Sequence, residues 1–296
     1  MRDGAMKQSV QDLLRRLNLK ATAENLFEGE KEPNSWGRLF GGMVAAQALS
    51  AACRTVPADR LPHSLHAFFL RPGDPERPVS YSVDPIRDGR SFTTRRVVAS
   101  QGEKAIFNMA ASFHIAQEGY AHQMAMPDVP PPESLKPWHE WALPVAETIE
   151  DPVRRARFLQ ERPIEMRYEH PPTYLGGKPR SGPAVVWFRP ASLLPDDELM
   201  HRCVLTYASD MSLLDNVVRP HGRRGPLGDL QIASLDHALW FHMPRIDLNQ
   251  WLLYYQDSPV AHGARGFARG SIYTRDGVLV ASVAQEGLAR PYRAQG

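Results

Sequence analysis

The stretch MVAAQALSAACRT, residues 43–55, decides the fold that we expect for this chain. It is rich in alanine and no proline follows it before Pro57, and both properties favour an α-helix. No residue from Met43 to Cys53 is charged. A helix that is apolar on all sides must be covered by other elements, so we expect a sheet around it.

The segments after this helix are rich in β-branched and aromatic residues, which are typical of strands. They are HSLHAFFLRP (63–72), VSYSVDP (79–85), RSFTTRRVVAS (90–100) and KAIFNMAASFHI (104–115). Turns are expected at Asp88-Gly89 and Gln101-Gly102. A short amphipathic helix at 5–18 and a strand at 25–30 precede the long helix. The first half therefore predicts one buried helix and an antiparallel meander.

The second half has the same order of elements. Strands are expected at 164–169, 184–190, 232–243, 251–256, 263–274 and 277–289, and a long helix at 196–217, with Asp196 as its cap. Between the halves, the prolines of residues 116–148 indicate an extended linker, followed by a short helix at 151–160.

The two halves correspond at an offset of 171 residues. His66-Ala67-Phe68-Phe69 aligns with His237-Ala238-Leu239-Trp240. Repeated order at a constant offset indicates an internal duplication. Few residues are identical between the two halves, so two unrelated α+β pieces would also account for the sequence. A curved antiparallel sheet wrapped on a helix is the hot-dog arrangement, so we predict an α+β double hot-dog. We divide it into an N-terminal repeat (1–118), a linker with a short helix (119–160) and a C-terminal repeat (161–296).

Composition excludes several classes of protein. Of 296 residues, 43% are hydrophobic and the formal net charge is +2, so a nucleic acid is not an expected partner. No segment approaches the roughly 18 apolar residues of a membrane span, and the charged N-terminus has no signal core. We therefore expect a cytoplasmic protein without membrane contact. Cys53 and Cys203 are each expected to be small core residues.

The standard catalytic and cofactor motifs are absent. The sequence has no GxSxG elbow, no HExxH and no Walker loop. His63 with His66, and His237 with His242, could be taken for metal pairs, but on a strand these spacings direct side chains to opposite faces. We expect no metal and no cofactor.

Three polar residues occupy positions at which the pattern of apolar residues predicts a buried side chain. Asp210 is expected on the second long helix, Ser234 at the start of a strand, and Gln285 on the last strand. Buried polar groups must satisfy one another, because each unpaired group costs about 1–3 kcal/mol. A carboxylate, a hydroxyl and an amide around one water form a general-base site. The first half lacks this set, since His63 and His114 occupy the equivalent positions.

At these residues the chain resembles the type II acyl-CoA thioesterases, the bacterial TesB-like and peroxisomal group, over about residues 8–290. The motifs are FGGMVAAQAL (40–49), HSLHAFFLRPGD (63–74), IRDGRSFTTRRV (86–97), MAASF (109–113), ASDMSLL (208–214), ASLDHALWFH (233–242) and ASVAQEGLAR (281–290). The resemblance implies a double hot-dog fold, acyl-CoA as substrate, and a nucleophilic water oriented by Asp210, Ser234 and Gln285. Many bacterial relatives have Thr at the position of Ser234.

An active site for acyl-CoA needs further groups that bind the oxyanion and the CoA phosphates. Backbone N–H groups, including those of the Gly41-Gly42 region, are the candidate hydrogen-bond donors to the oxyanion. The candidates for contacts to the CoA phosphates are seven arginines: Arg87, Arg90, Arg95, Arg96, Arg219, Arg223 and Arg224. Hot-dog sheets usually pair at their edges, so we expect a homodimer or homotetramer. Two alternatives remain open: an enoyl-CoA hydratase using Asp236-His237, and a non-catalytic acyl-CoA-binding scaffold.

Overall fold

The computed structural model of the chain describes residues 5–32, 37–222 and 230–291. Its helices are α1 (Gln8–Leu17), α2 (Gly41–Cys53), α3 (Trp138–Glu147), α4 (Pro152–Phe158), α5 (Glu198–Ser209) and α6 (Asp215–Val218). The first-half strands are β1 (Lys20–Ala23), β2 (Leu26–Gly29), β3 (Arg60–Phe69), β4 (Val79–Asp88), β5 (Phe92–Gln101) and β6 (Lys104–Ile115). The later strands are β7 (Lys136–Pro137), β8 (Ile164–Tyr168), β9 (Ala184–Pro190), β10 (Leu230–Ser234), β11 (Asp236–Phe241), β12 (Leu252–His262), β13 (Arg265–Thr274) and β14 (Leu279–Pro291).

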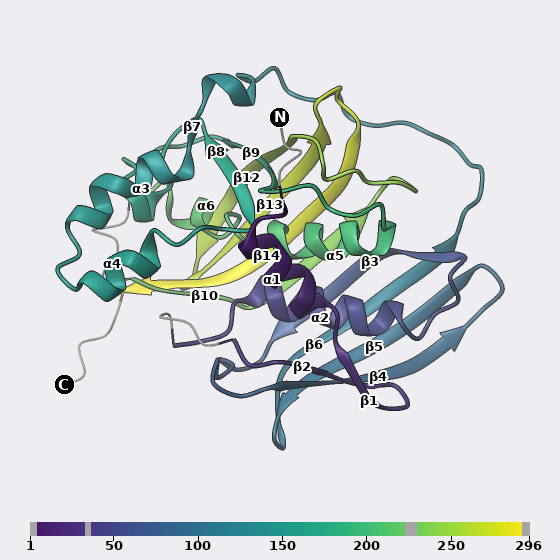
Figure 1. Cartoon of the computed structure of the whole chain (residues 1–296). Helices are drawn as coiled ribbons and strands as arrows, with labels where there is room; N and C mark the ends of the chain where they lie inside the picture. The colour runs from purple at the N-terminus through teal and green to yellow at the C-terminus, as the bar shows by residue number, and fades with distance from the viewer. Residues whose placement is uncertain (1–4, 33–36, 223–229, 292–296) are drawn as a thin grey trace.

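The strands of the described residues form one antiparallel sheet. Their order is β1-β2-β4-β5-β6-β3-β11-β14-β13-β12-β9-β8-β7, with β10 added beside β14. Within the described residues, the first-half and second-half strands meet only where β3 pairs with β11. Helices α2 and α5 pack against each other, and Figure 1 shows them in the middle of the molecule, between the strands of the two halves. The predicted double hot-dog is confirmed.

The register at the central seam agrees with the offset found in the sequence. His66 pairs with Ala238 and Ala67 pairs with His237. A shift of 171 residues exchanges the members of these two pairs, as a twofold axis through the seam requires. The motif that reveals the duplication is therefore also the contact that joins its two copies.

Helix α2 is almost fully buried, as its composition predicts. All of its residues from Gly42 to Cys53 are buried except Ser50, whose hydroxyl donates to the Leu17 carbonyl at 2.7 Å. Cys53 and Cys203 are also both buried and free, which confirms them as core residues. A hydrogen bond with the neighbouring Cys53 thiol, together with burial, raises the pKa of Cys203 well above its usual value, so this thiol stays protonated.

The second long helix is shorter than predicted. Helix α5 begins after Asp197, whose carboxylate accepts the N–H groups of Leu199 and Met200 at 3.0 and 3.1 Å, so the cap is Asp197 and not Asp196. The helix ends at Ser209, and a separate turn, α6, follows at Asp215. Asp210 is therefore the residue that ends the helix and not a residue within it, which is a correction to the sequence analysis.

The proline-rich segment is not a bare linker. Residues 116–131 have no regular structure, but the Pro130 carbonyl accepts the Trp187 indole N–H at 2.9 Å. Met126, Val129 and Leu135 pack on a second apolar cluster that contains Trp187. Helix α3 then forms within the range expected to be extended, although it contains Pro144. The segment thus covers the outer side of the second-half strands.

The predicted strand 232–243 is broken at Leu235 into β10 and β11. Ser234 pairs with Gly287 and Ala238 pairs with Ala284, so this strand spans one residue more than β14 between the two pairs. Such a bulge reverses the alternation of side chains along a strand. Residues on the two sides of the bulge that simple alternation would separate can therefore face the same element.

Candidate active site

The three sequence-predicted residues come together in one hydrogen-bonded group. The Gln285 amide Nε2 donates to Asp210 Oδ1 at 2.8 Å and to Ser234 Oγ at 2.7 Å. Gln285 is fully buried on β14, Ser234 ends β10, and Asp210 follows α5. The group is a carboxylate and a hydroxyl held together by one amide.

Asp210 lies in an environment that makes its carboxyl group a weaker acid. Burial raises its pKa to about 6, while hydrogen bonds from Gln285 and from the Gly42 backbone N–H lower it in part. The carboxyl group also stands at the end of α5, where a helix dipole disfavours a negative charge. At neutral pH the group is still ionised, and its pKa lies where a general base works well.

The first half of the chain contributes the opposite wall through Gly41 and Gly42, which open α2. A Cβ on Gly41 would lie 2.9 Å from Asp210 Oδ2 and 2.8 Å from the Phe69 ring, and one on Gly42 would lie 2.6 Å from the Tyr207 carbonyl. Only glycines allow the start of α2 to approach the carboxylate this closely. The Gly42 N–H, expected among the oxyanion donors, is bonded to Asp210 instead.

His237 is a neighbour of this group that the sequence analysis missed. Its ring is buried, Nε2 lies 2.8 Å from Ser209 Oγ, and Nδ1 lies 3.9 Å from Asp210 Oδ1. Strict alternation would have placed His237 and Ser234 on opposite faces, but the bulge between them brings both to Gln285. The sequence contains no signal for this bulge, because the bulge is defined by the pairing of β10 and β11 with β14.

Asp236 and His237 do not form the acid–base pair that a hydratase would need. Asp236 Oδ1 accepts the Glu286 backbone N–H at 2.6 Å, whereas the His237 ring faces Ser209. Among residues 5–32, 37–222 and 230–291, no group of three or more His, Cys, Asp or Glu side chains is arranged to hold a metal ion.

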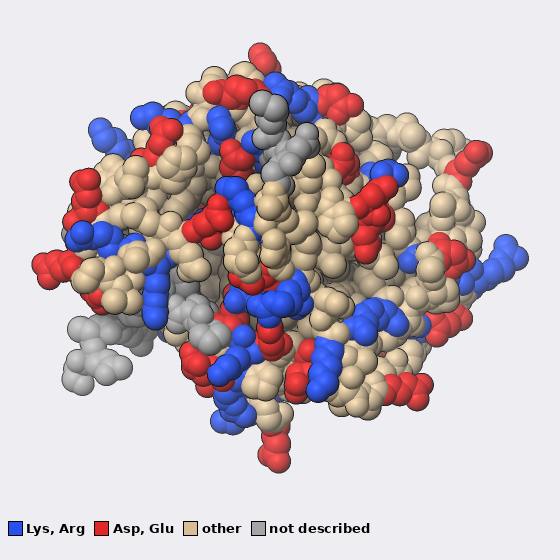
Figure 2. Space-filling model, in the orientation of Figure 1, with Lys and Arg blue, Asp and Glu red and all other residues tan. Residues whose placement is uncertain are grey.

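The arginines expected to contact CoA lie in different surroundings. Arg95 is buried, and its guanidinium donates to the Thr55 carbonyl at 2.9 Å and to Asp88 at 2.7 Å, so it serves the structure of the first half. Arg96 pairs with Asp84 on the surface, and Arg87 and Arg90 are exposed. Arg223 and Arg224 lie outside the described residues. Figure 2 shows basic and acidic side chains interspersed over one face of the molecule.

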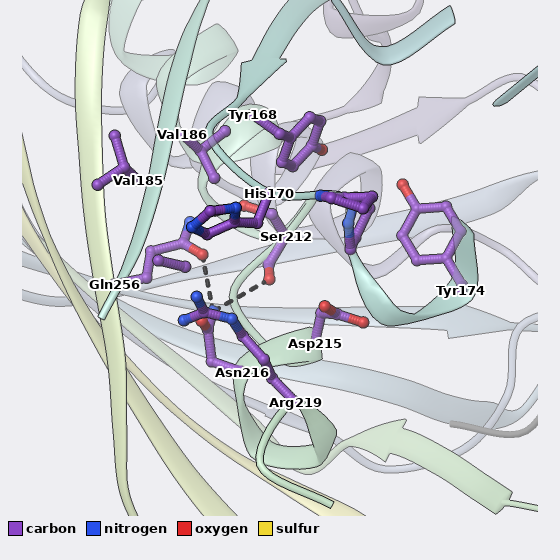
Figure 3. Close-up of a pocket in the computed structure, with 13 residues that line it drawn as sticks. Tyr168, His170, Tyr174, Val185, Val186, Ser212, Asp215, Asn216, Arg219 and Gln256 are labelled. Atoms are coloured by element: carbon purple, nitrogen blue, oxygen red, sulfur yellow. Dashed lines mark hydrogen bonds between the residues drawn. The ribbon is translucent and has the colours of Figure 1, made fainter. Parts of the chain in front are cut away.

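The seventh arginine, Arg219, lines a small pocket beside α6 (Figure 3). Its guanidinium donates to the Gly182 carbonyl at 2.9 Å. Asn216 donates to Gln256 Oε1 at 2.7 Å, and the Gln256 amide donates to Ser212 Oγ at 2.6 Å. These groups satisfy one another, so the pocket contains no second set like that around Asp210.

Helices long and apolar enough to cross a membrane are absent from the part of the chain that the structure describes. The family comparisons are consistent over both halves. A model described as acyl-CoA thioesterase matches residues 153–288, and one described as the acyl-CoA thioesterase N-terminal domain matches residues 31–114.

Individual relatives match over nearly their whole length. Acyl-CoA thioesterase 2 of Haemophilus influenzae is 36% identical over 96% of this chain and 99% of its own, and acyl-coenzyme A thioesterase 8 of Mus musculus is 40% identical over 93% and 87%. The crystal structure of an acyl-CoA thioesterase II from Mycobacterium marinum superposes with a TM-score of 0.76 at 40% identity, covering 95% of this chain and 98% of that one. With its double hot-dog fold and matches in both halves, the chain belongs to the acyl-CoA thioesterase family.

Proposed function

We propose that this protein hydrolyses acyl-CoA to a free fatty acid and CoA by means of a water molecule that Asp210, Ser234 and Gln285 orient. The observation that carries the proposal is the pair of bonds from one buried amide, 2.8 Å to the carboxylate and 2.7 Å to the hydroxyl. A thioester carbonyl is reactive enough for a positioned water to attack it without a covalent serine intermediate.

Each side chain has a role that follows from its donors and acceptors. The Gln285 amide occupies one lone pair of Asp210 Oδ1 and one of Ser234 Oγ. Ser234 accepts this bond, so its own hydroxyl hydrogen is available to another acceptor, the oxygen of the water. Asp210 accepts the proton of the water as the water oxygen attacks the carbonyl carbon.

The reaction then completes with balanced protons. Attack forms a tetrahedral oxyanion, the C–S bond breaks as the carbonyl re-forms, and the proton held by Asp210 passes to the departing thiolate. We assign the Gly41 N–H as an oxyanion donor, because the N–H groups of the first turn of a helix have no acceptor within the helix.

The test is release of CoA, followed with a thiol reagent, from short, long and branched acyl-CoAs. The parent protein should release CoA, and Asp210→Asn should lose about 10²–10⁴-fold in kcat. Asp236→Asn is the matched control, because it changes a half-buried carboxylate whose backbone partner an amide oxygen also satisfies. Release at the parent rate by Asp210→Asn would contradict the base assignment. Binding of acyl-CoA without any release would favour the scaffold alternative, and activity on enoyl-CoA would favour the hydratase.

We further propose a cytoplasmic homodimer or homotetramer whose chain divides at residues 1–118, 119–160 and 161–296. The net charge is small, and the end strands expected of a hot-dog sheet are uncovered. Within the described residues, β1 ends the sheet and all of its residues are exposed, which leaves an edge for a second copy of the chain. Light scattering after size-exclusion chromatography gives the mass of the assembly directly, and a monomer mass would reject it.

A further inference from the structure

Ser209, the last residue of α5, is held by groups from two strands of the sheet. It is fully buried, and the Tyr254 hydroxyl, from β12, donates to its carbonyl oxygen at 2.9 Å. The Ser209 hydroxyl donates its own hydrogen to the Thr206 carbonyl at 2.9 Å. The hydroxyl oxygen therefore accepts the Nε2–H of His237, from β11, at 2.8 Å.

These bonds satisfy carbonyl groups that the end of a helix leaves without partners. The last four carbonyls of a helix have no partner within it, and a buried helix end cannot obtain one from water. In α5, Thr206 accepts from Ser209 Oγ, and Ser209 accepts from Tyr254. The Ala208 carbonyl accepts the Met211 N–H at 3.1 Å. The bond from β12 thus takes the place of the bond that a further helical turn would have made, and α5 ends at Ser209.

The position of this helix end determines where the carboxylate of the next residue, Asp210, lies. The carboxylate accepts a hydrogen bond from Gln285 on β14 and one from the Gly42 N–H at the start of α2. Neither of these two groups titrates. Both are fixed to other elements of the fold, so a shift of the helix end would lengthen at least one of the two bonds.

Three titratable groups lie beside Asp210 within the described residues, and all are uncharged at neutral pH. Burial lowers the pKa of His237 to about 4 and raises the pKa of Tyr207, on α5, to about 12. Burial also raises the pKa of Tyr254 well above its usual value, with a smaller contribution from the charge of Asp210. The Tyr254 hydroxyl therefore keeps its hydrogen. A donor at the last carbonyl of a helix reduces the partial negative charge that the helix end sets beside the carboxylate.

We propose that Tyr254 and His237 are positioning residues, which hold both oxygens of Ser209 and thereby fix the place at which α5 ends. The carboxylate of Asp210 is kept in this way against its donors from β14 and α2. The proposal rests on the role assigned to Asp210 in the proposed function. Tyr254 and His237 do not touch the water or the substrate in this scheme, and they act through the backbone of the helix end.

The first test is the pH dependence of kcat in Tyr254→Phe, which removes one hydroxyl and keeps the ring. We expect kcat at pH 7 to fall about tenfold with little change in KM, as for one lost orienting bond. The midpoint of the pH profile should move to higher pH, because the ionised carboxylate loses a nearby donor dipole. Tyr168→Phe is the matched control, since that buried hydroxyl contacts the Met166 sulfur at 3.3 Å and not α5. A midpoint that stays at the parent value in Tyr254→Phe would overturn the proposal.

The bond from β11 is tested by two changes at His237. A glutamine can place its amide N–H near the position of the Nε2–H, whereas a methionine has no donor. We expect His237→Met to lower kcat about tenfold and to raise the midpoint, and His237→Gln to keep most of the parent rate. Equal losses in both variants would show that the packing of the ring, and not its bond to Ser209, is what matters.

An NMR titration separates this inference from the proposed function. With ¹³C-labelled aspartate, the carboxyl resonance missing from Asp210→Asn identifies Asp210 whether or not the protein is active. It should titrate near pH 6 in the parent and in Tyr168→Phe, and at higher pH in Tyr254→Phe. No release of CoA by the parent would overturn the proposed function, whereas an active parent with an unchanged titration in Tyr254→Phe would overturn only the inference. If Tyr254→Phe does not fold, the same titration of His237→Met and His237→Gln decides the inference.

Discussion

Asp210 and Gln285 lie 75 residues apart in the chain and are joined by a 2.8 Å hydrogen bond in a buried part of the molecule. Gln285 lies on β14, which follows β11 on the second-half side of the β3–β11 seam. Asp210 lies at the end of α5, the helix that packs against α2. The N-terminus of α2 closes the other side of the carboxylate with the Gly42 N–H. The proposed base therefore depends on contact between the two halves of the chain.

The pH dependence of the reaction should report the ionisation of Asp210. Because burial raises its pKa to about 6, kcat/KM should fall about tenfold per pH unit below this value and level off above it. The Gln285 bond stabilises the carboxylate and lowers its pKa, so Gln285→Met should move the midpoint to a higher pH. Rate profiles from pH 5 to 9 for both proteins check this. A midpoint that does not move, or that moves to lower pH, contradicts the assignment.

Ser234 should be replaceable by another hydroxyl but not by a methyl group. Ser234→Ala removes the acceptor of the 2.7 Å bond from Gln285 and the donor proposed for the water, so kcat should fall about tenfold or more. Ser234→Thr keeps the hydroxyl and should stay within a few-fold of the parent. Steady-state rates with one acyl-CoA separate the two variants. Equal losses in both would mean that the space at β10, and not the hydroxyl, matters.

Gly41 should tolerate no side chain. In Gly41→Ala the new Cβ would lie 2.9 Å from Asp210 Oδ2 and 2.8 Å from the Phe69 ring, so the start of α2 must move away from the carboxylate. We expect a loss of kcat of at least about tenfold, because displacing donors from a reacting group is costly. Gly119→Ala, where nothing lies within 4 Å, is the control and should keep the parent rate. An active Gly41→Ala would show that this approach is not needed.

The sequence could predict the fold because its signals are local and repeated. The apolar stretch of α2 and the alternating strands are recognisable within about ten residues, and the motif at 66–69 repeats at 237–240. Helix α3 could not be predicted, because Pro144 and the prolines around it disfavour a helix locally. Its Trp138 ring packs beneath Arg162, a long-range contact that local rules do not include. The domain boundaries stay a prediction.

Three residues that the sequence singles out come together in the structure, but their geometry could not be predicted, and their catalytic roles stay a prediction. Asp210, Ser234 and Gln285 could be found as polar residues in apolar surroundings, together with a family resemblance. Asp210 was placed within a helix, whereas α5 ends before it and the Tyr254 hydroxyl bonds the Ser209 carbonyl at 2.9 Å at that end. His237 was missed because the one-residue bulge depends on pairing with β14, which a single strand's pattern does not contain.

Asp210 should reduce the stability of the fold at the pH where it is active. The ordinary pKa of an aspartate carboxyl group is 3.8 and burial raises the pKa of Asp210 to about 6 in the folded protein, so folding favours the protonated form. The associated stability is present below the unfolded pKa and is lost as the pH rises through 6, and the ionised carboxylate then costs about 3 kcal/mol at 1.36 kcal/mol per pKa unit. Asp210→Asn removes this dependence.

The stability of Asp210→Asn relative to the parent should therefore increase with pH, by about 1–1.5 kcal/mol between pH 5 and pH 8. Its amide nitrogen meets one donor, Gln285 or Gly42, and this mismatch lowers the gain equally at both pH values because it does not titrate. Urea unfolding of both proteins at the two pH values gives the comparison. A difference in unfolding free energy that stays constant with pH would mean that Asp210 titrates alike in the folded and unfolded chains. The carboxylate would then be solvated in the folded protein, and the dry general-base site would not exist.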